Sequence, residues 1–284
     1  MTGVFGNDAA DVSVGFQFSL RTTEPRAGFV YRASLEAINA KAKTLGARIV
    51  YLMDNGLINR GSFEAIYPSP DICLVFLKAY LREAVDRGAY EADWNSTAVV
   101  EKVAARCPGR RTVVITHSAG QNIMPWATTP NVTAILAAHL PGQETGNSIV
   151  DVLWGDVNPS GRLPRNLTEG LMIDYRHFDS TNITPLYEFR YELSYTTFDV
   201  VGALSGSHVR DTIPERLPPA PTGVVPPGGN DALWKTVATV SATVQKSLPR
   251  AGATVLQLYL SFLNASVPTG TTVKVLRGFE KGLP

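Results

Sequence analysis

The chain has 284 residues, of which 44% are hydrophobic and 18% are charged, and its formal net charge at pH 7 is +1. This length can hold one large domain or two ordinary ones, each with its own core. The balanced charge argues against nucleic acid or an anionic membrane as a partner, and no apolar run approaches the roughly 18 residues of a transmembrane helix.

The first two-thirds of the chain alternate apolar runs with amphipathic stretches. The runs predict strands at residues 12–18, 47–53, 71–80, 111–117 and 132–140, and the amphipathic stretches predict helices at 34–46, 96–107 and 144–155. Buried strands separated by helices predict an α/β fold, in which a parallel or mixed sheet is flanked by helices as an α/β sandwich. We expect this domain to cover residues 1–198.

Two of these elements carry further detail. In the first helix, Leu35, Ile38, Ala42 and Leu45 share one face, with Ser34 as the N-cap; Ser96 is the expected N-cap of the second helix. The strand at 132–140 is expected to be buried, like the one at 71–80.

The pattern changes after residue 198. Residues 199–230 are rich in Pro and Gly and predict a linker or an exposed loop. Residues 231–284 contain strand patterns at 235–244, 253–262 and 271–279 with no helix between them, which predicts an incomplete antiparallel β-sandwich.

Ser118 follows an apolar run in "TVVITHSAG" and raises the question of a serine nucleophile. A nucleophile elbow needs glycine on both sides of the serine, and here Gly120 is present but Thr116 stands at the other position. A triad also needs a histidine that reaches the serine, and three candidates are equally placed: His139, His177 and His208. The favoured interpretation is structural, with His117 and Ser118 satisfying backbone groups at a strand end.

The cysteines and the glycosylation sequons indicate whether the protein is secreted. Cys73 lies in an apolar run and reads as a buried thiol, with a bridge to Cys107 left open. Five asparagines stand in N-x-[ST] sequons and are glycosylation candidates: Asn95, Asn131, Asn166, Asn182 and Asn264. They favour a secreted protein, although no signal peptide is visible at the start of the chain.

The stretch "LPGQETGNSIVDVLWGDVNPSGRLP" (140–164) has no metal-site or phosphate-loop spacing. It resembles the C-terminal α/β sandwich domain of glycoside hydrolase family 3, especially the fungal β-glucosidases. The resemblance continues through "IDYRHFD" (173–179), "TPLYEFRYELSYTTF" (184–198) and "LQLYLSF" (256–262), so that it covers nearly the whole chain. It implies that residues 231–284 are part of a fibronectin type III-like domain.

Members of this family are retaining glycosidases, in which a barrel-domain aspartate is the nucleophile and a glutamate of the second domain is the acid and then the base. Such a mechanism needs two carboxyls about 5 to 5.5 Å apart. The matching acid/base position here is Glu83, with Glu91 and Asp93 on the same segment as alternatives. The resemblance implies no metal and no organic cofactor, and it leaves no nucleophile in this chain.

The chain departs from the family pattern where glycines or small residues are expected. Arg82 and Ala84 flank Glu83, and Arg190 and Glu192 stand where the family normally has glycine. Removing a glycine restricts the backbone, so these substitutions are what relaxed constraint would produce.

The resulting expectation is a β-glucosidase-family protein whose substrate would be a β-glucoside or oligosaccharide with a terminal β-D-glucosyl residue. As a stand-alone chain it is expected to be inactive without a barrel, which a separate gene could supply. The alternatives are a non-catalytic carbohydrate-binding or interaction module and, with less support, a serine esterase that uses Ser118.

Overall fold

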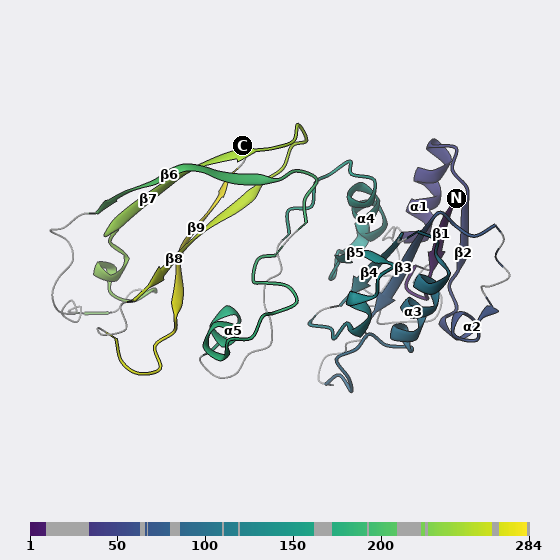
Figure 1. The fold of residues 1–284 in the computed structure, drawn as a ribbon, viewed down its shortest axis with the longest axis horizontal. Helices are drawn as coiled ribbons and strands as arrows, with labels where there is room; N and C mark the ends of the chain where they lie inside the picture. Colours follow the sequence, from purple (N-terminus) through teal and green to yellow (C-terminus); the bar gives the residue numbers. More distant parts are fainter. Residues whose placement is uncertain are drawn as a thin grey trace. The chain divides into compact units, whose positions relative to one another are not determined.

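A computed structural model gives the fold (Figure 1). It describes residues 1–9, 34–62, 66, 68–79, 86–109, 111–118, 120–161, 172–191, 193–208, 223–224, 227–262 and 267–282. These residues divide into two compact units, Met1–Val157 and Asn158–Pro284, which are taken here one at a time.

The first unit is built on a five-stranded sheet in which every strand runs parallel to its neighbours. The strands are β1 (Thr2–Phe5), β2 (Ile49–Leu52), β3 (Ile72–Lys78), β4 (Thr112–His117) and β5 (Val132–Ala137), in the order β2-β1-β3-β4-β5. The predicted α/β fold is therefore confirmed. The strand expected at 12–18 lies outside the described residues, and β1 is the first strand of the sheet.

Helices cover both faces of this sheet (Figure 1). They are α1 (Ser34–Thr44), α2 (Asn55–Asn59), α3 (Ser96–Arg106) and α4 (Thr145–Leu153), with short 3-10 turns η2 (Pro125–Thr128) and η3 (Gly142–Glu144). Helices α1 and α4 pack together, as do α2 and α3. The helices expected at 34–46, 96–107 and 144–155 are all present, whereas the five-residue α2 has no clear sequence signal.

The sheet has a separate core on each face because successive side chains of a strand point to opposite sides. One core joins the sheet to α2 and α3 and contains Phe5, Val75, Leu77, Val114, Ile58, Val99 and Val103. The other joins it to α1 and α4 and contains Val4, Leu74, Phe76, Ile115, Ile38 and Ile149. Strands covered on both sides need apolar residues at every position, which explains the unbroken apolar run of β3.

Three local expectations are wrong. Leu45 lies beyond the end of α1 and is 58% exposed, because the chain leaves the helix at Thr44. Asn95, not Ser96, is the N-cap residue of α3. Strand β5 is only partly buried, since it stands at the edge of the sheet with β4 as its one neighbour.

In the part of the second unit that the structure describes lie two antiparallel strand pairs and the α-helix α5. Its elements are α5 (Tyr175–Thr181), β6 (Phe198–His208), η5 (Asp231–Trp234), β7 (Ala238–Lys246), β8 (Thr254–Ser261) and β9 (Lys274–Gly282). Strand β6 pairs with β7, and β8 pairs with β9. The expected antiparallel strands are confirmed, but β6 occupies residues 199–208 of the segment predicted to be a linker.

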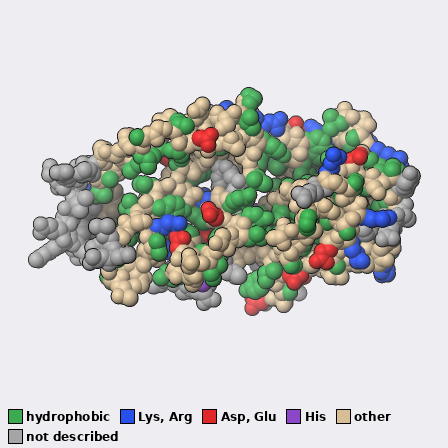
Figure 2. Space-filling view, viewed as in Figure 1, with side chains coloured by type: hydrophobic (Ala, Val, Ile, Leu, Met, Phe, Trp, Pro, Cys, Tyr) green, Lys and Arg blue, Asp and Glu red, His purple; other side chains and the backbone are tan. Residues whose placement is uncertain are grey.

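Some apolar side chains of these strands are exposed to solvent, and Figure 2 shows hydrophobic side chains in green at the surface. Leu204 of β6, Val240 of β7 and Phe279 of β9 are all exposed. Two-stranded pairs are marginally stable in isolation, so these faces are where further strands or a partner would add stability. None of the helices in the described ranges is long and apolar enough to cross a membrane.

Candidate active site

The carboxyl ends of β1, β3 and β4 meet at one edge of the sheet, because the three strands are parallel neighbours. This is the edge at which open α/β sheets bind their ligands. The β3–α3 segment (residues 79–95) starts there, and the candidate acid/base Glu83 belongs to it. Residues 80–85, Glu83 included, lie outside the described residues, so the structure shows the two ends of this segment.

The two ends of the β3–α3 segment meet at the last residue of β3. The amide of Ala79 donates to the carbonyl of His117 on β4 (2.9 Å), which continues the ladder by one residue. The amide of Asp93 donates to the carbonyl of Lys78 (3.0 Å). The chain therefore leaves the sheet at Lys78 and returns to it fifteen residues later, counting from Lys78 to Asp93.

The second half of the segment is held by Arg87. Its guanidinium donates to the carbonyls of Gln121 (2.8 Å) and Glu91 (3.0 Å) and to the Asn122 side chain (3.1 Å). The amide of Ile123 donates to the carbonyl of Tyr90 (2.9 Å). These bonds fix the return part of the segment against the chain that follows β4.

The two alternative carboxylates lie on this return part. Glu91 is exposed, and its Oε2 accepts a hydrogen bond from the Thr97 hydroxyl (2.6 Å). Asp93 gives its amide to Lys78 and accepts at its carbonyl from the Ser96 hydroxyl. Both residues thus have anchoring contacts at the start of α3.

A buried charged cluster lies at the same edge, and sequence reasoning missed it. Asp8, three residues after β1, is 1% exposed and accepts a short hydrogen bond from His117 Nδ1, at the end of β4. Lys78 Nζ lies 3.8 Å from the other carboxylate oxygen. The expected bond from His117 to the backbone is replaced by this pair with Asp8, 109 positions away in the sequence.

A glycine turn brings Asp8 into this position. Gly6 has a φ of +98°, and a Cβ there would lie 2.2 Å from the backbone oxygen of Phe76. The next amide, of Asn7, donates to the side chain of Asn55 (2.9 Å) at the start of α2. Only glycine lets the chain pass this close to β3 before it turns toward the cluster.

Ser118 is 3% exposed and is engaged with the backbone. Its hydroxyl donates to the carbonyl of Gly120 (2.7 Å) and accepts from the Gly120 amide (3.2 Å), with Asn122 3.3 Å away. These contacts are the local turn bonds expected of a serine after a strand. Of the candidate histidines, His139 is exposed, and the His177 ring meets that of Phe178 edge to face within α5; the side chain of His208 is outside the described residues.

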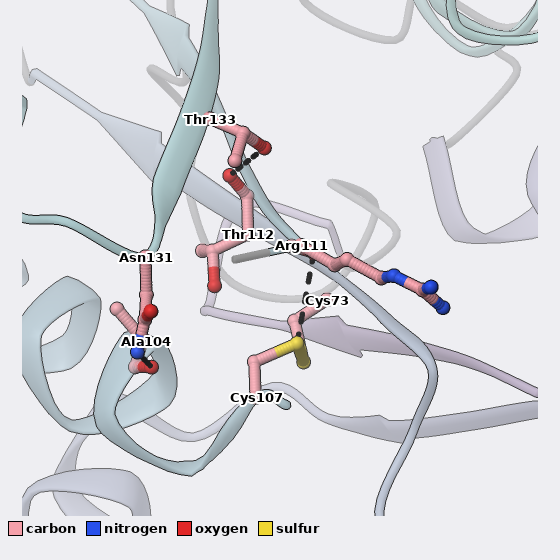
Figure 3. Close-up of a disulfide and its surroundings, with 7 residues drawn as sticks. All are labelled: Cys73, Ala104, Cys107, Arg111, Thr112, Asn131 and Thr133. Carbon is pink, nitrogen blue, oxygen red and sulfur yellow. Dashed lines mark hydrogen bonds between the residues drawn. A yellow bond between two sulfur atoms is a disulfide. The ribbon is translucent and has the colours of Figure 1, made fainter. Parts of the chain in front are cut away.

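Cys73 and Cys107 form a disulfide, so the interpretation of Cys73 as a free thiol is wrong (Figure 3). Their Cα atoms are 6.1 Å apart, within the usual span of such a bond. The bridge joins the start of β3 to the residue after α3, and both cysteines are buried. Periodicity alone could not show that these two ends meet, because the pairing depends on how α3 packs on the sheet.

The sequon asparagines have different surroundings. Asn95 and Asn182 are exposed. The side chain of Asn131 is partly buried, and its Nδ2 donates to the carbonyl of Ala104 in α3 (2.8 Å; Figure 3). Asn166 and Asn264 lie outside the described residues. Within the described ranges, no three His, Cys, Asp or Glu residues are grouped in a way that could hold a metal ion.

Residues 2–195 match the family model described as the glycosyl hydrolase family 3 C-terminal domain. The chain belongs to glycosyl hydrolase family 3. It is 41% identical to the probable beta-glucosidase G of Aspergillus flavus and 42% identical to that of Emericella nidulans. Each comparison covers 98% of this chain and 38% of the relative, so the chain spans well under half of the length of these family 3 relatives.

Solved structures of family 3 enzymes share the fold. The beta-D-glucoside glucohydrolase of Trichoderma reesei matches 99% of the chain with a TM-score of 0.77 and 30% identity. The beta-glucosidase D2-BGL of Chaetomella raphigera matches the same share with a TM-score of 0.79, also at 30% identity. In both cases 43% of the solved chain is covered. The family 3 fold thus extends over both units.

Proposed function

We propose that this chain is the C-terminal part of a retaining β-glucosidase and that Glu83 is its acid/base carboxyl. The observation that carries the proposal is the 41% identity to a probable beta-glucosidase over 98% of the chain. The place of Glu83 in the sequence supports the assignment, since it follows β3, which ends at the carboxyl edge of the sheet.

The nucleophile would come from another polypeptide segment. A retaining mechanism needs an ionised carboxylate about 5 to 5.5 Å from the acid, with the anomeric carbon between them. The relatives are more than twice as long as the part that this chain matches, which leaves ample length for a barrel that carries this residue. By itself, the 284-residue chain is therefore expected to release no sugar.

The proposed substrate is a β-glucoside or oligosaccharide that ends in a β-D-glucosyl residue, and the proposed location is extracellular. The buried disulfide Cys73–Cys107 supports the location, because disulfides persist in oxidising compartments. The exposed sequons at Asn95 and Asn182 fit the same route.

The test is a chimera in which this chain replaces the matching part of beta-glucosidase G from Aspergillus flavus. Release of nitrophenol from an aryl β-glucoside is expected for the chimera and not for the 284-residue chain alone. In the chimera, Glu83→Gln should lower kcat at least about a hundredfold, the usual contribution of a positioned general acid. The loss of kcat/KM, which reports the first step, should be smaller for a dinitrophenyl glucoside, because its leaving group needs no protonation.

The matched control is Glu101→Gln, which changes an exposed glutamate of α3 and should leave turnover unchanged. Glu91→Gln tests the alternative carboxylate. The assignment of Glu83 is contradicted if Glu91→Gln abolishes turnover while Glu83→Gln does not. Turnover by the 284-residue chain alone would contradict the need for a second segment.

A further inference from the structure

The buried charges at the carboxyl edge lie where the β3–α3 segment joins the sheet. Lys78 and His117 are register partners on β3 and β4, and the backbone carbonyls of both accept the bonds that hold the segment, from Asp93 and Ala79. Asp8 contacts both side chains, with His117 Nδ1 on one carboxylate oxygen and Lys78 Nζ 3.8 Å from the other. The Asp8 carboxylate therefore links Lys78 and His117, the two strand-end residues to which both ends of this segment are hydrogen-bonded.

Asp8, Lys78 and His117 are buried together, so the charge of each one affects the other two. Asp8 and His117 are each 1% exposed, and Lys78 is 9% exposed. A buried carboxylate without a cation or hydrogen-bond donors is strongly unfavourable, so Asp8 constrains where the Lys78 ammonium can lie. Among the residues that the structure describes, the buried Nε2 atom of His117 has no hydrogen-bond partner, and the contact of Nδ1 with Asp8 orients this ring.

Lys78 extends this constraint to the return end of the segment. Its ammonium lies 5.2 Å from the centre of the Trp94 ring, within cation–π range. Trp94 and Asn95 both have positive φ angles, +57° and +52°. Two successive left-handed residues that are not glycine persist only where surrounding contacts hold them. Two such contacts of Trp94 are with the Lys78 ammonium and with Asn55 Nδ2, which donates to the Trp94 carbonyl (3.1 Å).

We propose that Asp8 and His117 are positioning residues that act through Lys78 to fix the two described ends of the β3–α3 segment at the sheet, and that the proposed acid/base role of Glu83 depends on this. This inference rests on the assignment of Glu83 proposed above. All three residues lie at the base of the segment, and none of them is assigned a contact with the sugar. Displacing a catalytic acid by about 1 Å can lower the reaction rate about a hundredfold. Fixing the two ends of the segment that carries the acid therefore matters for catalysis.

The first test is hydrogen exchange of single amides by NMR in the 284-residue chain, which requires no turnover. In Asp8→Asn, the amides of Ala79 and Asp93 should exchange at least about tenfold faster, whereas those of Val75 and Val114 in the strands should keep their rates. Asp156→Asn is the matched control, because it removes a carboxylate from the exposed pair with Lys41 and should change neither amide.

Unchanged exchange at Ala79 and Asp93 in a folded Asp8→Asn variant would overturn the inference. An equal increase at all four amides would also overturn it, because it would indicate only a loss of global stability. If Asp8→Asn does not fold, Lys78→Met and Lys78→Arg replace it. The segment should be mobile in the first variant and protected in the second, and equal exchange in both would count against the proposal.

The second test uses the chimera. Asp8→Asn should lower kcat at least about tenfold and leave KM within about twofold, because the acid is displaced while the sugar contacts remain. An unchanged kcat together with faster segment exchange would overturn the role in positioning Glu83. A chimera without turnover before any substitution would count against the proposed function, while the exchange experiment would still decide whether Asp8 holds the segment.

Discussion

The disulfide between Cys73 and Cys107 closes a covalent loop around the β3–α3 segment. The two cysteines are 34 positions apart, and everything from β3 to the end of α3 lies between them. The segment is thus held at two levels: by the disulfide at the amino end of β3, and by hydrogen bonds and buried charges at its carboxyl end. Both arrangements restrict the same part of the chain, which contains Glu83.

Removing the disulfide should destabilise the first unit. Closing a loop of this length restricts the unfolded chain, and such bonds typically contribute about 2–4 kcal/mol. We expect the double variant Cys73→Ala/Cys107→Ala to lose about this much free energy of unfolding in urea. Reductant should lower the stability of the natural chain and leave the variant unaffected. A variant as stable as the oxidised chain would show that the bond restricts little.

Gly6 should be intolerant of any side chain. Its φ of +98° is unfavourable for other residues, and an added Cβ would lie 2.2 Å from the Phe76 oxygen. We expect Gly6→Ala to lower the free energy of unfolding by at least about 2 kcal/mol. Gly46→Ala is the control, since Gly46 also has a positive φ but open space around it. It should cost about 1 kcal/mol, and equal costs at both sites would contradict the predicted clash.

Most strands and helices of the first unit follow from the sequence pattern, because apolar periodicity is a local signal, but the pattern did not predict β1 or α2. The long unbroken run of β3 correctly predicted burial on both faces. The same reasoning wrongly predicted that β5 is buried. Its sequence is as apolar as that of β3, but β5 stands at an edge of the sheet. Burial depends on the neighbours that a strand acquires, and periodicity does not specify them.

The candidate site was less predictable than the fold. Glu83 was identified through family resemblance, whereas Asp8 gave no signal, because it follows β1, a strand that the pattern did not predict. Its role depends on His117, 109 positions later, and on the glycine turn at Gly6 that brings it to the cluster. Such long-range pairs are set by strand order and register, and a single sequence does not contain that information directly.

Alkaline pH should weaken the second unit through Tyr259. Burial, with a smaller effect of the neighbouring Tyr175, raises the pKa of the Tyr259 phenol. The unfolded chain would therefore ionise first, so the stabilisation is present below about pH 10 and is lost as pH rises through the folded-state pKa. Unfolding followed from pH 8 to 12 should show a shallower loss of stability in Tyr259→Phe. A Tyr259→Phe variant that loses stability as steeply as the natural chain would contradict this prediction.

Arg190 has a φ of +68°, a backbone conformation that favours glycine, which is the residue that the sequence resemblance leads us to expect at this position. Its guanidinium lies over the rings of Phe189 (5.2 Å) and Phe279 (5.5 Å), which offsets part of the backbone strain. Arg190→Gly and Arg190→Ala both remove these contacts, but only glycine relieves the strained φ. We expect the glycine variant to be more stable than the alanine variant by about 1–2 kcal/mol in urea unfolding. At an ordinary φ this order is reversed, so an alanine variant that is the more stable of the two would contradict the strain at Arg190.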